Sequence, residues 1–148
     1  MTKSVSSKNI VLYADDDADD LQLVQDAFLQ YANYVSVFPV NNGVEALSYL
    51  KNLPESDPPP CLIILDVNMP RMNGKEALLS IRQIKRFDSV PIILFTTSNQ
   101  LHDKEFANRY KAGFITKPIN VRQMDIITDT FIDYCTEEIR KKIKKKAN

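Results

Sequence analysis

Polar side chains that could do chemistry stand where apolar segments of the sequence end. They are Asp15 and Asp16 after segment 10–14, Asp66 after 61–65, Thr96 after 91–95 and Lys117 after 114–116. Carboxylates that share one place repel one another unless a cation neutralises them, and Mg²⁺ prefers such oxygen ligands. A hydroxyl and an ammonium beside such an ion would bind phosphoryl oxygens. The residue types therefore indicate phosphoryl transfer.

These residues meet only if the apolar segments are strands of one sheet. Short apolar runs alternate with helical patterns along the chain, which is typical of a parallel sheet wrapped by helices. The expected strands are 10–14, 34–40, 61–65, 91–95 and 114–116. Ligands bind such sheets outside the carboxyl ends of the strands, so we expect the polar residues to converge there. Pro39 cannot donate to a ladder on both sides, which places its strand at an edge.

The composition fits one ordinary globular domain. The chain has 148 residues, of which 44% are hydrophobic and 26% charged, enough for a core without disulfides. Its 19 basic and 19 acidic residues cancel, so the net charge favours neither nucleic acid nor membrane as a partner. Cys61 and Cys135 lie in apolar patterns and are interpreted as buried thiols in a reducing compartment. With no signal-like or membrane-length apolar run, we expect a cytoplasmic protein.

The two ends of the chain differ from its middle. We expect residues 1–8 to form a flexible N-terminus, 9–138 the domain and 139–148 a basic C-terminal tail. The tail is interpreted as a solvated helix end, because cations stabilise a helix C-terminus. A contact with nucleic acid or lipid is the alternative for this run of positive charge.

The sequence resembles the receiver family of two-component signalling over roughly residues 9–134. The resemblance rests on Asp15-Asp16, the segment 64–74, Thr96 with Thr97-Ser98, and Lys117-Pro118. It implies a flavodoxin-like α/β fold, a doubly wound sheet of five parallel strands in the order 2-1-3-4-5 with five helices. The acidic stretch 16–20 and the long loop 54–60 are similar to single-domain regulators linked to phytochrome kinases.

The resemblance implies a phosphoacceptor and its metal ligands. Asp66 would accept the phosphoryl group. Asp15, Asp16, Asp66 and the main-chain carbonyl of Asn68 would bind Mg²⁺ or Mn²⁺, with Asp15 acting largely through water.

The resemblance also implies residues that bind the phosphoryl group and respond to it. Thr96 would bond this group and move toward it, and the neighbouring Thr97 would narrow access to the site. Lys117 would pair with the phosphoryl group. Phe114 falls at the switch aromatic, whose rotamer accompanies the movement of the threonine. The Lys117-Pro118 bond matches the cis peptide of the family.

The function implied by this resemblance is a phosphorylation switch. A sensor histidine kinase or a histidine phosphotransfer protein would donate the phosphoryl group, and Mg²⁺-dependent self-phosphorylation and dephosphorylation would accompany it. The face of the fourth helix, fifth strand and fifth helix would then bind an unknown downstream protein differently. We expect no direct DNA binding and no membrane contact. The sequence leaves open a homodimer formed through the last helix and the fifth strand.

Other interpretations of the same residues compete with the switch. A dehalogenase-type phosphohydrolase would need an aspartate as general acid where Asn68 stands, and a flavin site would need a phosphate loop after the first strand. A scaffold that has lost the chemistry is a third alternative. Asp17, Asp19 and Asp20 are interpreted as helix caps, and His102 as a solvent-facing side chain.

Overall fold

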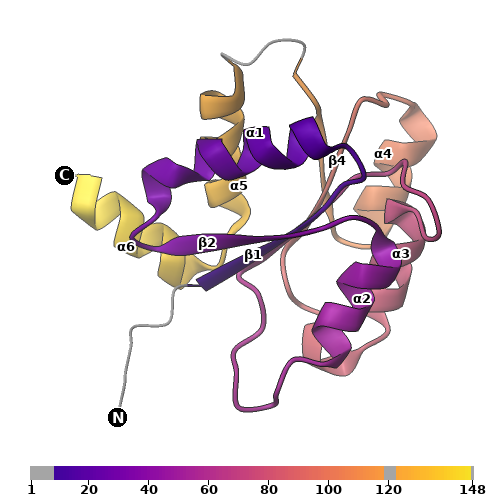
Figure 1. The fold of residues 1–148 in the computed structure, drawn as a ribbon, viewed down its shortest axis with the longest axis horizontal. Helices are drawn as coiled ribbons and strands as arrows, with labels where there is room; N and C mark the ends of the chain where they lie inside the picture. The colour runs from indigo at the N-terminus through magenta and orange to yellow at the C-terminus, as the bar shows by residue number, and fades with distance from the viewer. Residues whose placement is uncertain (1–8, 119–122, 148) are drawn as a thin grey trace.

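One layer of strands lies between two layers of helices (Figure 1). The computed structural model describes residues 9–118 and 123–147. The strands are β1 (Asn9–Ala14), β2 (Val35–Val40), β3 (Leu62–Leu65), β4 (Ile92–Thr96) and β5 (Gly113–Thr116). The helices are α1 (Ala18–Phe28), α2 (Gly43–Lys51), α3 (Gly74–Arg82), α4 (Leu101–Arg109), α5 (Met124–Tyr134) and α6 (Glu137–Ala147), with short 3₁₀ helices η1 (Leu29–Tyr31) and η2 (Lys85–Phe87).

The strands form one parallel sheet in the order β2-β1-β3-β4-β5, which confirms the predicted topology. The edge strand β2 carries Pro39, as its missing N–H group requires. The strand order reverses between β1 and β3, where Ala14 pairs with Leu65. The residues that follow these two strands therefore leave the sheet side by side.

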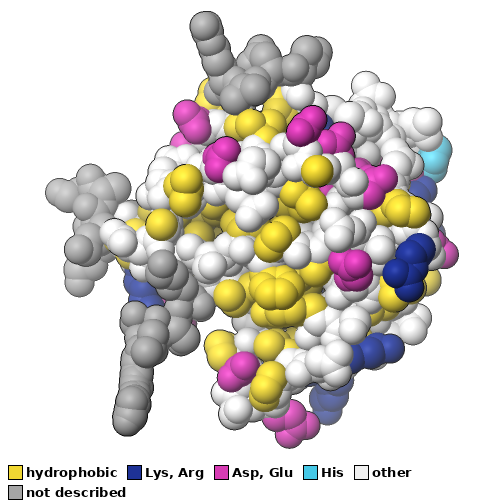
Figure 2. All heavy atoms as spheres, viewed as in Figure 1, with side chains coloured by type: hydrophobic (Ala, Val, Ile, Leu, Met, Phe, Trp, Pro, Cys, Tyr) yellow, Lys and Arg dark blue, Asp and Glu magenta, His cyan; other side chains and the backbone are white. Residues whose placement is uncertain are grey.

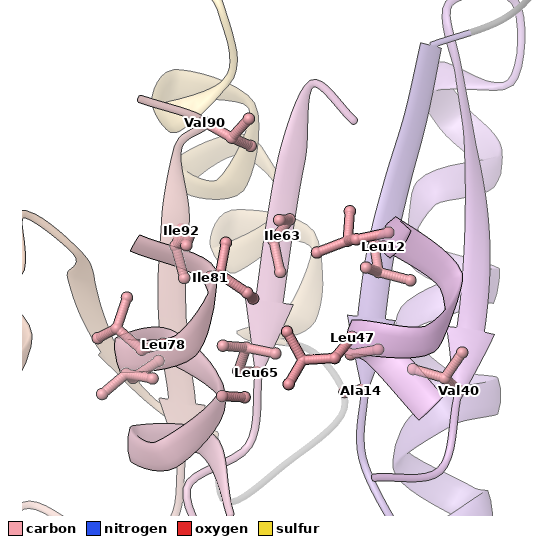
Figure 3. Close-up of a cluster of buried hydrophobic side chains, with 14 of the residues drawn as sticks. Leu12, Ala14, Val40, Leu47, Ile63, Leu65, Leu78, Ile81, Val90 and Ile92 are labelled. Atoms are coloured by element: carbon pink, nitrogen blue, oxygen red, sulfur yellow. The ribbon is translucent and has the colours of Figure 1, made fainter. Parts of the chain in front are cut away.

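The central strands feed two separate hydrophobic cores, because successive side chains point to opposite faces of a sheet. Leu12, Ile63 and Leu65 face the core under α2 and α3 (Figure 3). Tyr13 and Ile64, one residue out of step with that set, belong to the core under α1 and α5. All residues of β3 are buried, as expected of a central strand covered on both faces. Its carboxyl end is therefore rigidly placed.

Side-chain caps fix where two helices begin. The side chain of Asn42 accepts a hydrogen bond from the Glu45 N–H at the start of α2. At the start of α3, Asn73 accepts from the Glu76 N–H while Glu76 accepts from the Asn73 N–H, which is a capping box. The turn residues of the sequence thus act as helix caps.

The C-terminal segment differs from the prediction, because α6 is a sixth α-helix among the described residues. Its Ile139 is 1% exposed, and Ile143, one turn later, packs on the same core as α1 and α5. Apolar residues four apart on one helix face explain why this segment docks instead of remaining a solvated tail. Cys61 and Cys135 are free and buried in that core, as predicted. The predicted flexible segment 1–8 lies outside the described residues.

The molecular surface around β2 exposes hydrophobic side chains (Figure 2). Phe38 is 43% exposed and lies against Tyr49, with 4.5 Å between ring centroids. On α4, the His102 side chain is 68% exposed, as predicted. Among residues 9–118 and 123–147, no helix combines the length and the apolar character needed to span a membrane.

Arg82 joins two loops at the end of the sheet opposite the predicted site. Its guanidinium donates to the carbonyl of Val90 at 2.7 Å and of Asp88 at 3.2 Å, before β4. It also donates to the carbonyls of Tyr110 at 2.9 Å and Lys111 at 3.2 Å, before β5. The planar fork of donors in arginine allows one side chain to bind both loops.

Arg82→Met is expected to lower the free energy of unfolding by about 2 kcal/mol, because charged hydrogen bonds to half-buried carbonyls are lost. Arg82→Lys should not restore it, since one ammonium cannot bind both loops. Urea unfolding measures this change. The exposed neighbour Lys85, changed to Met, is the control and should alter stability by less than about 0.5 kcal/mol. Equal effects of the two Met variants would contradict the inferred role.

Candidate functional site

Three carboxylates meet at the carboxyl ends of β1 and β3. Asp15 is fully buried, Asp66 is 6% exposed and Asp16 is exposed. One carboxylate oxygen from each lies within 4.8 Å of the others. The pairing of the two strands produces this arrangement, and the Asp66 N–H donates to the Ala14 carbonyl at 3.0 Å. The sequence prediction that these acids converge is therefore confirmed as geometry.

Lys117, just after β5, reaches into this acidic cluster. Its Nζ lies 2.7 Å from Asp15 Oδ2 and 3.1 Å from Asp66 Oδ2. A third carboxylate, Asp20 on α1, lies 2.8 Å from the same Nζ. Burial alone would lower the pKa of Lys117, but the hydrogen bonds to Asp15 and Asp20 and the surrounding negative charge raise it well above its ordinary value. The side chain therefore stays a cation.

Asp15 is held by contacts from its own segment as well as by Lys117. Its Oδ1 accepts from the Asp17 N–H at 2.9 Å. Its Oδ2 accepts from the buried hydroxyl of Tyr13 at 2.5 Å. Burial and the neighbouring Asp15 charge raise the pKa of Tyr13, so the hydroxyl remains a donor. Both oxygens of the most buried acid thus have fixed partners.

Two residues of the site were missed by the sequence analysis. Tyr13 had been assigned only to a strand, although the alternation of side chains places it on the same face as Asp15. Asp20 had been interpreted as a helix cap. The structure gives that role to Asp17, whose side chain accepts from the N–H groups of Asp19 and Asp20. Only the rotation of α1 reveals that Asp20 faces Lys117.

The backbone around Asp66 is held closely by the start of α3. A Cβ on Gly74 would lie 2.2 Å from the Asp66 carbonyl oxygen, so a larger residue would displace this backbone. The Gly74 N–H donates to the Val67 carbonyl at 3.0 Å. The Asn68 N–H, one residue further on, donates to Asp66 Oδ1 at 3.3 Å. Asn68 is exposed, so its surroundings remain accessible to solvent.

Thr96 ends the neighbouring strand β4 and is fully buried. Its Oγ1 accepts from the Ser98 N–H at 3.3 Å, and its carbonyl accepts from the Lys117 N–H at 2.7 Å. Thr97 is exposed beside it. Thr96 and Lys117 therefore lie at the carboxyl ends of two paired strands, at the same end of the sheet as the acids.

The neighbourhood of β5 contains Phe114 and the bond between Lys117 and Pro118. Phe114 is partly buried against the core under α3 and lies beneath Lys104, with 6.0 Å from Nζ to the ring centroid. The predicted cis bond between Lys117 and Pro118 is wrong, because the described residues contain no cis peptide bond. The trans form of an X-Pro bond is the more stable one, and Nζ reaches the acids with the bond in that form.

The surroundings of Asp66 raise the pKa of its carboxyl group. Burial raises its pKa, the Lys117 charge lowers it and the Asp15 charge raises it again, with a net value of about 6. A carboxylate in this position is costly because like charges share a poorly hydrated space. The oxygen-only donor set, with exposed Asp16 at its rim, fits a hard divalent cation that keeps some of its water.

Comparison with known proteins identifies the family. A family model described as the response regulator receiver domain matches residues 11–128. The chain belongs to this family. Receiver domains are signalling domains that histidine kinases phosphorylate. The assignment agrees with the predicted two-component class and with the sheet order found here.

Two proteins similar to this chain are the response regulators Rcp1 and RcpA. Response regulator Rcp1 of a Synechocystis strain is 28% identical over 127 residues, which cover 84% of this chain and 86% of Rcp1. The crystal structure of the phosphorylated cyanobacterial phytochrome response regulator RcpA superposes with a TM-score of 0.77 at 26% identity, covering 88% of this chain and 98% of RcpA. The Mn²⁺-bound form of Rcp1 has a TM-score of 0.76 at 24% identity, covering 86% and 97%. Some other relatives are longer proteins, of which the chain spans 48% or less.

The raised pKa of Asp66 predicts a pH-dependent gain of stability when its charge is removed. Native Asp66 keeps its proton up to about pH 6, whereas the ordinary value is 3.8, so the native state binds more protons between these values. Stability therefore falls as pH rises through this window. Without metal, Asp66→Asn should raise the free energy of unfolding by about 1–3 kcal/mol near pH 7.5, and by much less near pH 4.5.

Urea unfolding in the presence of a chelator, at both pH values, measures this difference. The exposed Asp88, changed to Asn, is the control and should show no such pH-dependent gain. A loss of stability in Asp66→Asn that is the same at both pH values would contradict a raised pKa of Asp66 in the native state.

Proposed function

We propose that this receiver domain accepts a phosphoryl group on Asp66 from a sensor histidine kinase or a histidine phosphotransfer protein. The observation that carries the proposal is the convergence of Asp66 with Asp15, Asp16 and Lys117 from three strand ends. Asp66 is a buried carboxylate with a raised pKa and lies 3.1 Å from an ammonium. Such a combination is typical of functional sites. Similarity to a response regulator whose phosphorylated form has been solved supports the same role.

The transfer is a nucleophilic displacement at phosphorus. A carboxylate oxygen of Asp66 forms the new bond to phosphorus, and the bond from phosphorus to the donor imidazole nitrogen breaks. The electron pair of that bond leaves with the imidazole. Lys117 neutralises the developing negative charge, while Thr96 and the Asn68 N–H can donate hydrogen bonds to phosphoryl oxygens. Acetyl phosphate, with a carboxylate leaving group, could replace the histidine donor in self-phosphorylation.

We assign the divalent cation to Asp15, Asp16 and Asp66, with the main-chain carbonyl of Asn68 as a further ligand. When bound, Mg²⁺ or Mn²⁺ would supply positive charge against phosphoryl oxygens. The three-carboxylate geometry supports this assignment, and the solved Mn²⁺-bound form of Rcp1 agrees with it. In this arrangement Asp16 is the exposed ligand that an entering ion meets first.

Phosphorylation would be passed to α4 through the loop after β4. Movement of Thr96 toward the phosphoryl group would pull Ser98, whose N–H it binds. The Ser98 hydroxyl donates to buried Asp103 on α4 at 2.7 Å, so the loop and the helix are tied together. The half-buried Phe114 lies near α4 and could repack when the loop moves. The face of α4, β5 and α5 would then bind a downstream protein with a different affinity.

The competing functions have less support than the phosphorylation switch. Membership of the receiver family disfavours the phosphohydrolase and the flavin protein. A scaffold that is not phosphorylated is distinguished from the switch by labelling with acetyl phosphate. Similarity to RcpA, a cyanobacterial phytochrome response regulator, supports a phytochrome-type kinase as the donor.

Incubation with acetyl phosphate and Mg²⁺ should add one phosphoryl group to the wild-type chain. Asp66→Asn should add none, because an amide cannot form the acyl phosphate. Asp88→Asn, which removes an exposed carboxylate elsewhere, should be labelled like the wild type. Intact-mass spectrometry measures all three proteins. Labelling of Asp66→Asn would remove Asp66 from the role, and an unlabelled wild type would favour the scaffold.

Mg²⁺ should raise the Tm of the wild-type chain by stabilising the native state. A ligand at 100 times its Kd contributes about 2.7 kcal/mol. Asp16→Asn should lose most of this increase, whereas Asp19→Asn, which removes an equal charge in the first turn of α1, should keep it. Differential scanning calorimetry with and without the ion gives the shifts. Equal losses in both variants would reduce the effect to general electrostatics.

A further inference from the structure

All hydrogen-bond donors of the Lys117 ammonium are already used. The group has three N–H bonds, and three carboxylates lie within reach of it, Asp15 at 2.7 Å, Asp20 at 2.8 Å and Asp66 at 3.1 Å. A phosphoryl oxygen on Asp66 can bind Lys117 only if one of these contacts is given up. Phosphorylation is therefore an exchange of partners at the lysine. Asp66 gives up its own contact when its oxygen bonds to phosphorus, and a second phosphoryl oxygen can bind only if Asp15 or Asp20 also leaves.

The surroundings of the three acids decide which contact is exchanged. Asp15 is fully buried and is also held by Tyr13 and by the Asp17 N–H, so releasing it would leave a buried charge without its cation. Asp66 itself carries the phosphoryl group. The Asp20 side chain is 32% exposed and can be hydrated when it is released. Asp20 is thus the acid that can leave Lys117 at the smallest cost.

The position of Asp20 on α1 allows it to move without unfolding the helix. The helix cap is made by Asp17, which binds the Asp20 backbone N–H and leaves the Asp20 side chain free for Lys117. Phosphorylation adds negative charge close to Lys117, and this charge repels the Asp20 carboxylate. The two anions therefore compete for the same cation.

We propose that Asp20 is a resting-state counter-ion that competes with the phosphoryl group for Lys117 and thereby limits phosphorylation of Asp66. Asp20 is a positioning residue, since it acts through Lys117 and does not touch the reacting atoms. This inference rests on the proposed function. It also explains why this receiver carries a fourth acid near its site, beyond the three that cluster for a cation.

The test compares Asp20→Asn, Asp20→Glu and Asp19→Asn by titration calorimetry with beryllofluoride, a phosphoryl mimic, at saturating Mg²⁺. Asp20→Asn should bind the mimic about three- to fivefold more tightly than the wild type, the range for losing a partly exposed ion pair. Asp20→Glu keeps a carboxylate within reach of Lys117 and should stay near the wild type. Asp19→Asn removes the same charge one residue away and should also change little.

A second measurement reports on Lys117 without metal or mimic. In protein with ¹⁵N-labelled lysine, the NMR signal of the Lys117 ammonium should shift and exchange faster with water in Asp20→Asn, but not in Asp19→Asn. A structural defect alone would not be repaired by Asp20→Glu. The free energy of unfolding of each variant, measured with urea, separates a stability change from the change in affinity.

The outcomes distinguish this inference from the proposed function. If wild type and Asp20→Asn both fail to bind beryllofluoride and to be labelled by acetyl phosphate, the proposed function fails, and the competition fails with it. If both bind but Asp20→Asn binds no more tightly than Asp19→Asn, the competition alone is overturned. An unchanged Lys117 signal in Asp20→Asn would overturn it as well.

Discussion

The site depends on the crowding of four carboxylates around one ammonium. Asp15, Asp20 and Asp66 each contact Lys117, and Asp16 lies beside them at the rim. One cation cannot balance four anions, and the pKa of Asp66 rises to about 6 as burial and the charge of Asp15 outweigh that of Lys117. The cluster is costly to the folded state. This cost makes the site receptive to a second cation and to an exchange of partners.

The fold imposes this crowding through features that are unrelated to charge. β1 and β3 pair as far as Ala14 and Leu65, so the next residue of each strand is forced to be a neighbour. The strands are anchored by two cores that bury both faces of the sheet. Figure 3 shows the core under α2 and α3. Gly74 then brings α3 against the Asp66 carbonyl, which leaves the acid little room to withdraw. Packing energy, spread over the whole sheet, thus holds the acids together against their repulsion.

The sequence predicted the parts of the site that follow from strand ends, and missed those that depend on helix placement. Asp15, Asp66 and Lys117 were found because each ends an apolar run, and the ends of parallel strands meet. Asp20 was missed because a contact across α1 depends on how that helix is rotated against the sheet. The docking of α6 through Ile139 was missed for a related reason, since a run of lysines hides the spacing of its apolar residues. Local patterns identify elements, whereas contacts between elements require their packing.

A short covalent and hydrogen-bonded path joins Asp66 to α4. Gly74 touches the Asp66 backbone, and the next residue, Lys75, places its ammonium 2.5 Å from Asp103. Asp103 also accepts a hydrogen bond from the Ser98 hydroxyl. The pKa of Asp103 is lowered because these contacts outweigh the effect of burial. The same buried carboxylate is therefore bound to the helix that packs on Asp66 and to the loop that follows Thr96. A change at the proposed phosphorylation site would reach α4 by both routes, and because both end on Asp103, they would displace one helix instead of two independent segments.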